Sequence, residues 1–272
     1  MDRLNICLYE FVGTALLVLG YNFTNMGLAV CFNLFVGILL AQKISGGMFN
    51  PAVTVAIYLT EGTMFNDLQL ILMIVCFQIL GAYFGIIMGH FCIGEPAFLC
   101  PFESRAGCLQ YDDNDWLKVC LLEFWCTFFF CLCILCQIFT RTQDSQDGVL
   151  QAGAIAVTLY AMIQFAGPIS GGCFNPAFGL TQTTYQVGYM NSLGFEGRIY
   201  QKYMSLYIFA PLAGGIAASM FMRFVHNPNL GFLDNRSMTL SEHSALSEDS
   251  LEKAEEEGVG ESENLKGKKD DR

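Results

Sequence analysis

The sequence predicts an all-α membrane protein with six transmembrane helices and two half-helices in an inverted repeat. Composition is the first observation, since 53% of the residues are hydrophobic and only 14% are charged. Soluble domains carry about 25% charged residues. The second observation is a set of six long apolar runs, and the third is a nine-residue motif that occurs twice.

The six apolar runs are the predicted transmembrane helices. A helix needs about 20 apolar residues to cross a hydrocarbon core of about 30 Å, and a tilted or snorkelling helix varies around that length. The second and fifth runs are shorter than the others, and each continues into a further apolar segment that begins with proline. The runs lie at about residues 4–23, 27–42, 68–90, 116–139, 149–166 and 204–224.

The two proline-led segments, 51–60 and 176–186, are predicted to be half-helices. Ten residues make about 15 Å of helix, which enters a membrane without crossing it. Pro51 and Pro176 suit the first helical turn, where the missing N–H has no partner. The preceding residues, Asn50 and Asn175, are good N-caps.

The repeat determines how these segments enter the membrane. Residues 44–52 read ISGGMFNPA and residues 169–177 read ISGGCFNPA, identical at eight of nine positions. Three predicted spans separate the copies, so the half-helices must enter from opposite faces. Backbone that is not helical at membrane depth must be buried or line a wet cavity. Ala52 and Ala177 are expected to let the two helix starts approach closely.

A positively polarised centre follows from this geometry. Each half-helix N-terminus carries roughly +0.5 charge, and the Asn50 and Asn175 amides can present further N–H donors. Such a centre orients a water or hydroxyl oxygen and opposes cations and protons. Water and small neutral solutes are therefore the expected partners of the pore, within a lipid bilayer. Glu10 and Glu123 are carboxylates inside the apolar first and fourth spans, where a charge is costly unless it is paired, so both are predicted to be functional.

The predicted channel domain covers residues 1–226, with inverted halves at about 4–92 and 116–226. Residues 227–272 hold 12 of the 25 Asp and Glu residues and almost no aromatic residues, which predicts a disordered acidic tail. The acidity therefore comes mainly from the tail, and nothing in the charge pattern favours nucleic-acid binding.

The twelve cysteines lie mostly inside apolar runs, where cysteine behaves as a small hydrophobe. Cys100 and Cys108 fall in a polar loop and could form a disulfide if that loop faces an oxidising compartment, although connectivity cannot be deduced from sequence. The histidines and cysteines show no metal-binding pattern, and no cofactor, metal or catalytic residue is predicted.

The paired NPA motifs, the two glutamates, FQILGA at 77–82 and PLAGG at 211–215 together resemble the major intrinsic protein family of aquaporins and aquaglyceroporins. The resemblance covers about residues 4–225. It implies an hourglass fold, a homotetramer with one pore per protomer, and a role for Glu10 and Glu123 in bracing the NPA loops. It also favours cytosolic termini, while the plasma and vacuolar membranes both remain open as locations.

Family spacing also places the selectivity filter at Val30, Ile163, Cys173 and Phe178. Most of the family reads NPAR at the second motif, whereas this chain reads NPAF. Gly179 follows, where glycerol channels have Asp. The expected filter is apolar and has no fixed cation. Loss of the Arg widens the pore and removes an anchor for hydroxyl groups, whereas the Phe178 ring could fill or occlude the gap.

A passive water channel is the function that these features favour. A channel of aquaglyceroporin type, or one for ammonia, urea or peroxide, is the first alternative. A junctional or scaffolding membrane protein with a closed pore is the second. A secondary transporter also uses inverted repeats, but it would need paired intramembrane charges for a coupling ion, and only Glu10 and Glu123 are available. An enzyme is disfavoured because no nucleophile and base set is present.

Overall fold

The fold is entirely α-helical over the residues that the computed structural model describes, namely 2–24, 27–101, 116–139, 145–195 and 201–226. All of these residues belong to one compact unit, Met1–Leu230. The predicted acidic tail at 227–272 lies outside the described residues, so its disorder and the boundary at 226 stay predictions. The elements are α1 (Arg3–Thr24), α2 (Gly27–Ala41), α3 (Pro51–Glu61), α4 (Leu68–Ile93), α5 (Trp116–Ile138), α6 (Gly148–Ser170), α7 (Pro176–Ser192) and α9 (Met204–Phe221), which a π-helical turn (Met222–His226) continues.

Five of the described helices, α1, α4, α5, α6 and α9, are long and apolar enough to span a membrane. The remaining predicted span, which is the second along the chain, corresponds to α2 and has 15 residues, or about 22 Å of helix. After α2 the chain turns at 42–45 and enters the protein interior toward Asn50. A shorter helix is sufficient here because the chain turns inward at its end.

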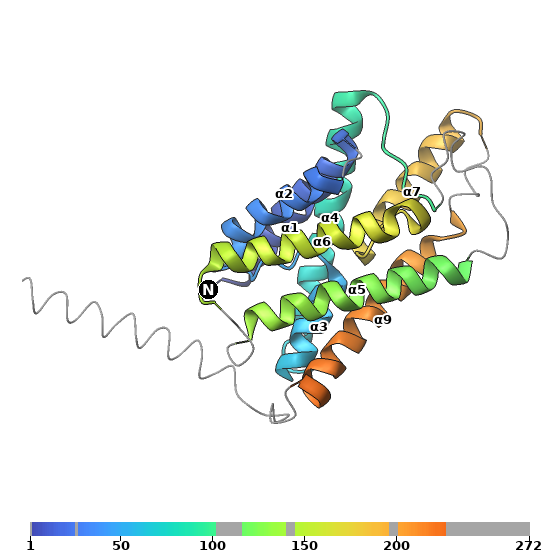
Figure 1. Cartoon of the computed structure of the whole chain (residues 1–272). Coiled ribbons are helices and arrows are strands. Elements are labelled where there is room, and N and C mark those ends of the chain that lie inside the picture. Colours follow the sequence, from blue (N-terminus) through green and yellow to red (C-terminus); the bar gives the residue numbers. More distant parts are fainter. Residues whose placement is uncertain (1, 25–26, 102–115, 140–144, 196–200, 227–272) are drawn as a thin grey trace, which may run out of the picture. The chain divides into compact units, whose positions relative to one another are not determined.

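The half-helices α3 and α7 begin next to each other and run away from one another (Figure 1). Helix α3 ends at Glu61, close to the predicted 60, where Gly62 adopts a left-handed C-cap at φ 80°. Helix α7 continues to Ser192, six residues beyond the predicted end. The extra turns leave α7 much longer than α3, and the repeat is therefore asymmetric at this end.

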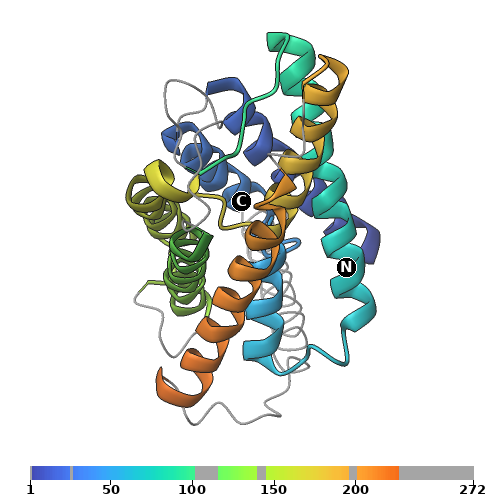
Figure 2. The same cartoon turned by 90° about the vertical axis from the view of Figure 1, so that its right-hand side faces the viewer.

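The long helices pack in two equivalent pairs, α1 with α4 and α5 with α9, which are visible around the half-helices in Figure 2. Glycines bring the backbones together. A Cβ built on Gly81 would lie 2.3 Å from the Phe11 carbonyl oxygen, and one on Gly214 would lie 2.4 Å from the Phe124 carbonyl oxygen. Small residues at helix crossings allow such close approach in membrane proteins.

Candidate functional site

The two NPA motifs meet through reciprocal hydrogen bonds. Asn50 caps α3, with its Oδ1 accepting from the Ala52 N–H at 2.9 Å, while its Nδ2 donates to the Phe174 carbonyl at 2.8 Å. Asn175 caps α7 in the same way through the Ala177 N–H at 3.0 Å, and its Nδ2 donates to the Phe49 carbonyl at 2.9 Å. The N-termini of α3 and α7 are thus joined directly.

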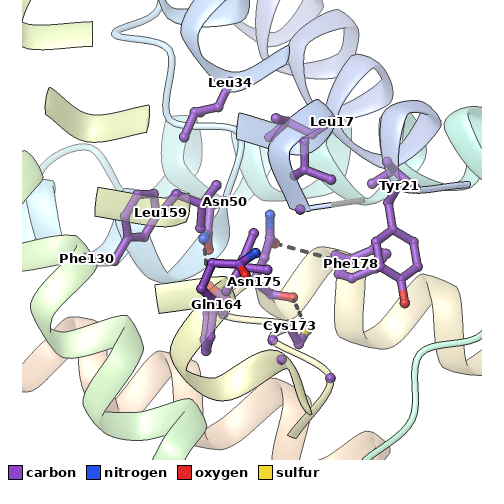
Figure 3. Close-up of a pocket in the computed structure, with 18 of the residues that line it drawn as sticks. Leu17, Tyr21, Leu34, Asn50, Phe130, Leu159, Gln164, Cys173, Asn175 and Phe178 are labelled. Carbon is purple, nitrogen blue, oxygen red and sulfur yellow. Dashed lines mark hydrogen bonds between the residues drawn. The ribbon is translucent and has the colours of Figure 1, made fainter. Parts of the chain in front are cut away.

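Each asparagine amide keeps one N–H beyond these contacts. An amide nitrogen carries two hydrogens, and the bond to the opposite loop uses one of them. Both side chains line the same cavity, so the second hydrogen of each is available to a molecule inside it (Figure 3). Pro51 and Pro176 occupy the first helical turn, as predicted, and Ala52 and Ala177 are almost completely buried.

Both loops before the asparagines share an unusual backbone. Phe49 and Phe174 have φ of 51° and 47°, a left-handed conformation that residues other than glycine rarely adopt. The glycine pairs that precede them also have positive φ. The Phe49 ring lies where a Cβ on Gly13 would stand, 2.0 Å from its Cε1 atom. Burial of the two phenylalanine rings therefore holds the strained loops in place.

The carboxylates Glu10 and Glu123 are completely buried and accept hydrogen bonds from these loops. Glu10 accepts from Ser45 Oγ at 2.6 Å and from the backbone N–H groups of Met48 and Phe49 at 3.0 and 2.7 Å. Glu123 makes the equivalent bonds to Ser170 Oγ at 2.7 Å and to the N–H groups of Cys173 and Phe174 at 3.0 and 2.8 Å. This arrangement matches the expected bracing geometry.

Gln78 adds a fourth hydrogen bond in the first half only. Its Nε2 donates to Glu10 Oε2 at 2.8 Å and to Thr54 Oγ1 at 3.0 Å, so it links the loop carboxylate to α3. The equivalent helix of the second half carries Pro211, at the same distance before its packing glycine. Sequence reasoning noted FQILGA but missed this role, because a glutamine in an apolar helix gives no direct signal of its partner.

A cavity of about 240 Å³ surrounds the two asparagines. All four predicted filter residues, Val30, Ile163, Cys173 and Phe178, line it. The structure adds lining residues that sequence reasoning missed, because their contribution depends on how distant helices face one another. Those labelled in Figure 3 are Leu17, Tyr21, Leu34, Phe130, Leu159 and Gln164.

Cys173 and Phe178 line the cavity, and both side chains contact neighbouring residues of the cavity lining. The Cys173 thiol donates to the Asn175 carbonyl at 3.2 Å, and Cys173 is 5% exposed. The Phe178 ring packs edge to face against Tyr21, with centroids 4.8 Å apart and planes at 70°. The Phe178 residue as a whole is 8% exposed.

A loop segment, residues 97–100, lies at the Tyr21 end of the cavity. Gln186 accepts from the Leu99 N–H and donates to the Leu99 carbonyl, both at 2.9 Å. Asn22 accepts from the Ala97 N–H at 3.0 Å, and Tyr21 donates to the Phe98 carbonyl at 2.9 Å. The unexpected turns of α7 also contact this segment, because Val187 and Met190 pack against Cys100.

Cys100 belongs to this segment, lines the cavity and is disulfide-bonded. Cys108, the partner that the sequence suggested, lies outside the described residues.

The electrostatics of the cavity come from dipoles and amide donors. Among its described lining residues none carries a formal charge, and the filter portion is mainly apolar and aromatic. The dipoles of α3 and α7, which both begin at the cavity, and the second amide hydrogens of Asn50 and Asn175 make the centre positive. Such a cavity can offer hydrogen-bond donors to a neutral oxygen and opposes a cation.

Comparison with known proteins places these features in context. The model of the family described as "Major intrinsic protein" matches residues 3–222. The chain is 29% identical to Nodulin-26 of Glycine max over 221 residues, which covers 79% of this chain and 72% of that protein. It is 28% identical to the probable aquaporin TIP2-2 of Oryza sativa subsp. japonica over 206 residues, 74% of this chain and 72% of that one.

A solved structure has the same fold. The aquaglyceroporin from Plasmodium falciparum superposes with a TM-score of 0.66 at 19% identity, covering 85% of this chain and 100% of that one. The predicted all-helical fold is therefore confirmed.

Proposed function

The chain belongs to the major intrinsic protein family, and from this premise we propose that it is a passive transmembrane channel for water and other small neutral solutes. One observation carries the proposal. The amides of Asn50 and Asn175 hold each other's loops and still offer one N–H each to a shared cavity. A water oxygen can accept from both in turn as it passes.

The same centre accounts for the exclusion of ions and protons. A cation would have to leave its hydration shell in a cavity whose centre carries two positive helix ends. A water molecule that accepts from the asparagine donors points its hydrogens away from the centre on both sides, which interrupts a chain of water-to-water proton donation. The Asn50 and Asn175 donors are therefore the proposed barrier, and Glu10 and Glu123 are proposed to hold it in position.

The chain is an integral membrane protein, as its family and its five long apolar helices indicate. We propose that it assembles as a homotetramer with one pore per protomer, that both termini face the cytosol, and that it catalyses no reaction. The proposed filter consists of Val30, Ile163, Cys173 and Phe178, all of which line the cavity.

Stopped-flow light scattering on proteoliposomes tests the channel. Purified protein should raise the water permeability well above that of empty liposomes, with a low activation energy and without any ion gradient. A double variant, Asn50→Leu with Asn175→Leu, should abolish the increase. Tyr83→Phe is a matched control, because its hydroxyl contacts Thr184 outside the cavity.

Two outcomes, a closed pore and a transporter, would contradict the proposal. Water flux equal to that of empty liposomes would favour the closed-pore scaffold, and rescue of flux by Phe178→Arg would assign the closure to that ring. Flux that saturates with solute or needs an ion gradient would favour a transporter. Glycerol and urea gradients, run on the same vesicles, establish the range of solutes.

A further inference from the structure

Tyr21 connects the filter to the loop segment 97–100. Its ring packs on Phe178, and its hydroxyl donates to the Phe98 carbonyl. Tyr21 lies near the end of α1, 157 residues before Phe178 in the sequence. Figure 3 shows the two rings side by side at one end of the cavity, with Asn175 toward the other side.

We propose that Tyr21 is a specificity-determining residue, which holds the Phe178 ring against the cavity wall and thereby sets the width of the filter. The inference rests on the proposed channel function and adds a residue outside the four filter positions.

The Phe178 ring has two alternatives, the wall and the lumen. Its backbone is fixed, because the Phe178 N–H donates to Asn175 Oδ1 at 3.3 Å within the first turn of α7. At the wall the ring joins a buried cluster that includes Val18, Cys173 and Tyr207. The edge-to-face contact with Tyr21 adds to this packing and is absent when the ring points into the lumen.

Tyr21 can limit the position of the Phe178 ring because its own side chain is fixed by a hydrogen bond. Its hydroxyl is bound to the Phe98 carbonyl, and the next residue, Leu99, makes two hydrogen bonds with Gln186 of α7. These contacts connect α7 to the loop segment 97–100, the loop segment to Tyr21, and Tyr21 back to Phe178 on α7. The aromatic contact should change the wall-to-lumen ratio by a factor of about 2 to 12.

Two substitutions of Tyr21 distinguish the contribution of its ring from that of its hydroxyl. Tyr21→Leu removes the aromatic edge, so the Phe178 ring should enter the lumen more often. Water flux per protomer should fall by at most the same factor of about 2 to 12, because the flux follows the fraction of protomers with the ring at the wall, and urea or glycerol flux should fall further. Tyr21→Phe retains the ring and should change flux less. Tyr83→Phe, which loses a tyrosine hydrogen bond outside the cavity, should leave flux unchanged.

A double-mutant cycle in proteoliposomes provides the decisive test. In a Phe178→Ala background there is no ring to release, so Tyr21→Leu should no longer lower the flux. A Tyr21→Leu flux equal to the wild type, or an equal loss with and without the Phe178 ring, would overturn the inference. So would a larger effect of Tyr21→Phe than of Tyr21→Leu.

Two measurements keep this inference separate from the channel proposal. Wild-type water flux above that of empty liposomes tests the channel, whereas the cycle tests Tyr21. Size-exclusion chromatography in detergent gives the folded fraction of each variant, to which every flux is normalised. If Tyr21→Leu does not fold, Tyr21→Met, which also removes the aromatic ring, is measured in both backgrounds. A solute ratio that differs from wild type only when Phe178 is present supports the inference, and an unchanged ratio overturns it.

Discussion

Replacing Glu10 with glutamine should destabilise the protein about twice as much as the same change at Glu123. Each Glu10 oxygen accepts two hydrogen bonds, from Ser45 and Met48 on Oε1 and from Phe49 and Gln78 on Oε2. A glutamine has one carbonyl oxygen and one NH₂ group. With Ser45 and Gln78 in the orientations that they have here, either orientation of the new amide places its NH₂ against two donors and loses both bonds.

At Glu123 the loss is smaller. Oε1 accepts from Ser170 and Cys173, but Oε2 accepts only from the Phe174 N–H. A glutamine can keep its oxygen toward the first two donors and lose one bond. Hydrogen bonds to charged groups contribute about 1.5–3 kcal/mol each, so the expected costs are about 3–6 kcal/mol at Glu10 and about 1.5–3 kcal/mol at Glu123.

Thermal unfolding of the detergent-solubilised protein, followed by size-exclusion chromatography after heating, measures the two variants under identical conditions. The midpoint should fall in both and should fall further for Glu10→Gln. The two sites are each other's control, since the chemical change and the depth of burial are the same. Equal midpoints, or a lower midpoint for Glu123→Gln, would refute the count of hydrogen bonds as the cause.

Three further predictions concern the pore centre and the helix crossings. Asn50→Asp keeps the N-cap oxygen but replaces the lumen donor with a negative charge, so proton flux, measured with a pH dye inside vesicles, should rise while water flux falls. Gly81→Ala should lower the unfolding midpoint, because overpacking reduces the free energy of unfolding by about 1–3 kcal/mol, whereas Gly153→Ala, with nothing within 4 Å of its Cβ, should not lower it. Gly27→Ala places a Cβ 2.6 Å from Ile163 Cγ2. Because it forces that side chain to shift at the filter, glycerol flux should fall more than water flux, and an equal fall in both would argue against a filter role for Ile163.

Much of the fold could be predicted because its signals are local. Apolar length identified the long helices, and the Asn-Pro pairs marked the first residues of α3 and α7 correctly. Counting spans between the two motifs established that the half-helices oppose one another. The end of α7 could not be predicted in this way, because Val187 and Met190 of its last turns pack on Cys100 of the loop segment, a contact that is made only in the folded chain.

For the candidate site too, some features could be predicted from the sequence and others required the tertiary structure. The sequence alone was enough to select Asn50, Asn175, Glu10 and Glu123 as candidates, since a polar residue inside an apolar or repeated segment is costly unless it has a partner. Tertiary structure was needed to reveal the partners: the amide-to-carbonyl exchange between loops 125 residues apart, and the packing of Tyr21 on Phe178. Periodicity, capping and desolvation act on neighbouring residues and are encoded locally. The shape of the cavity depends on which helix faces meet, and that is decided only when all the helices pack together.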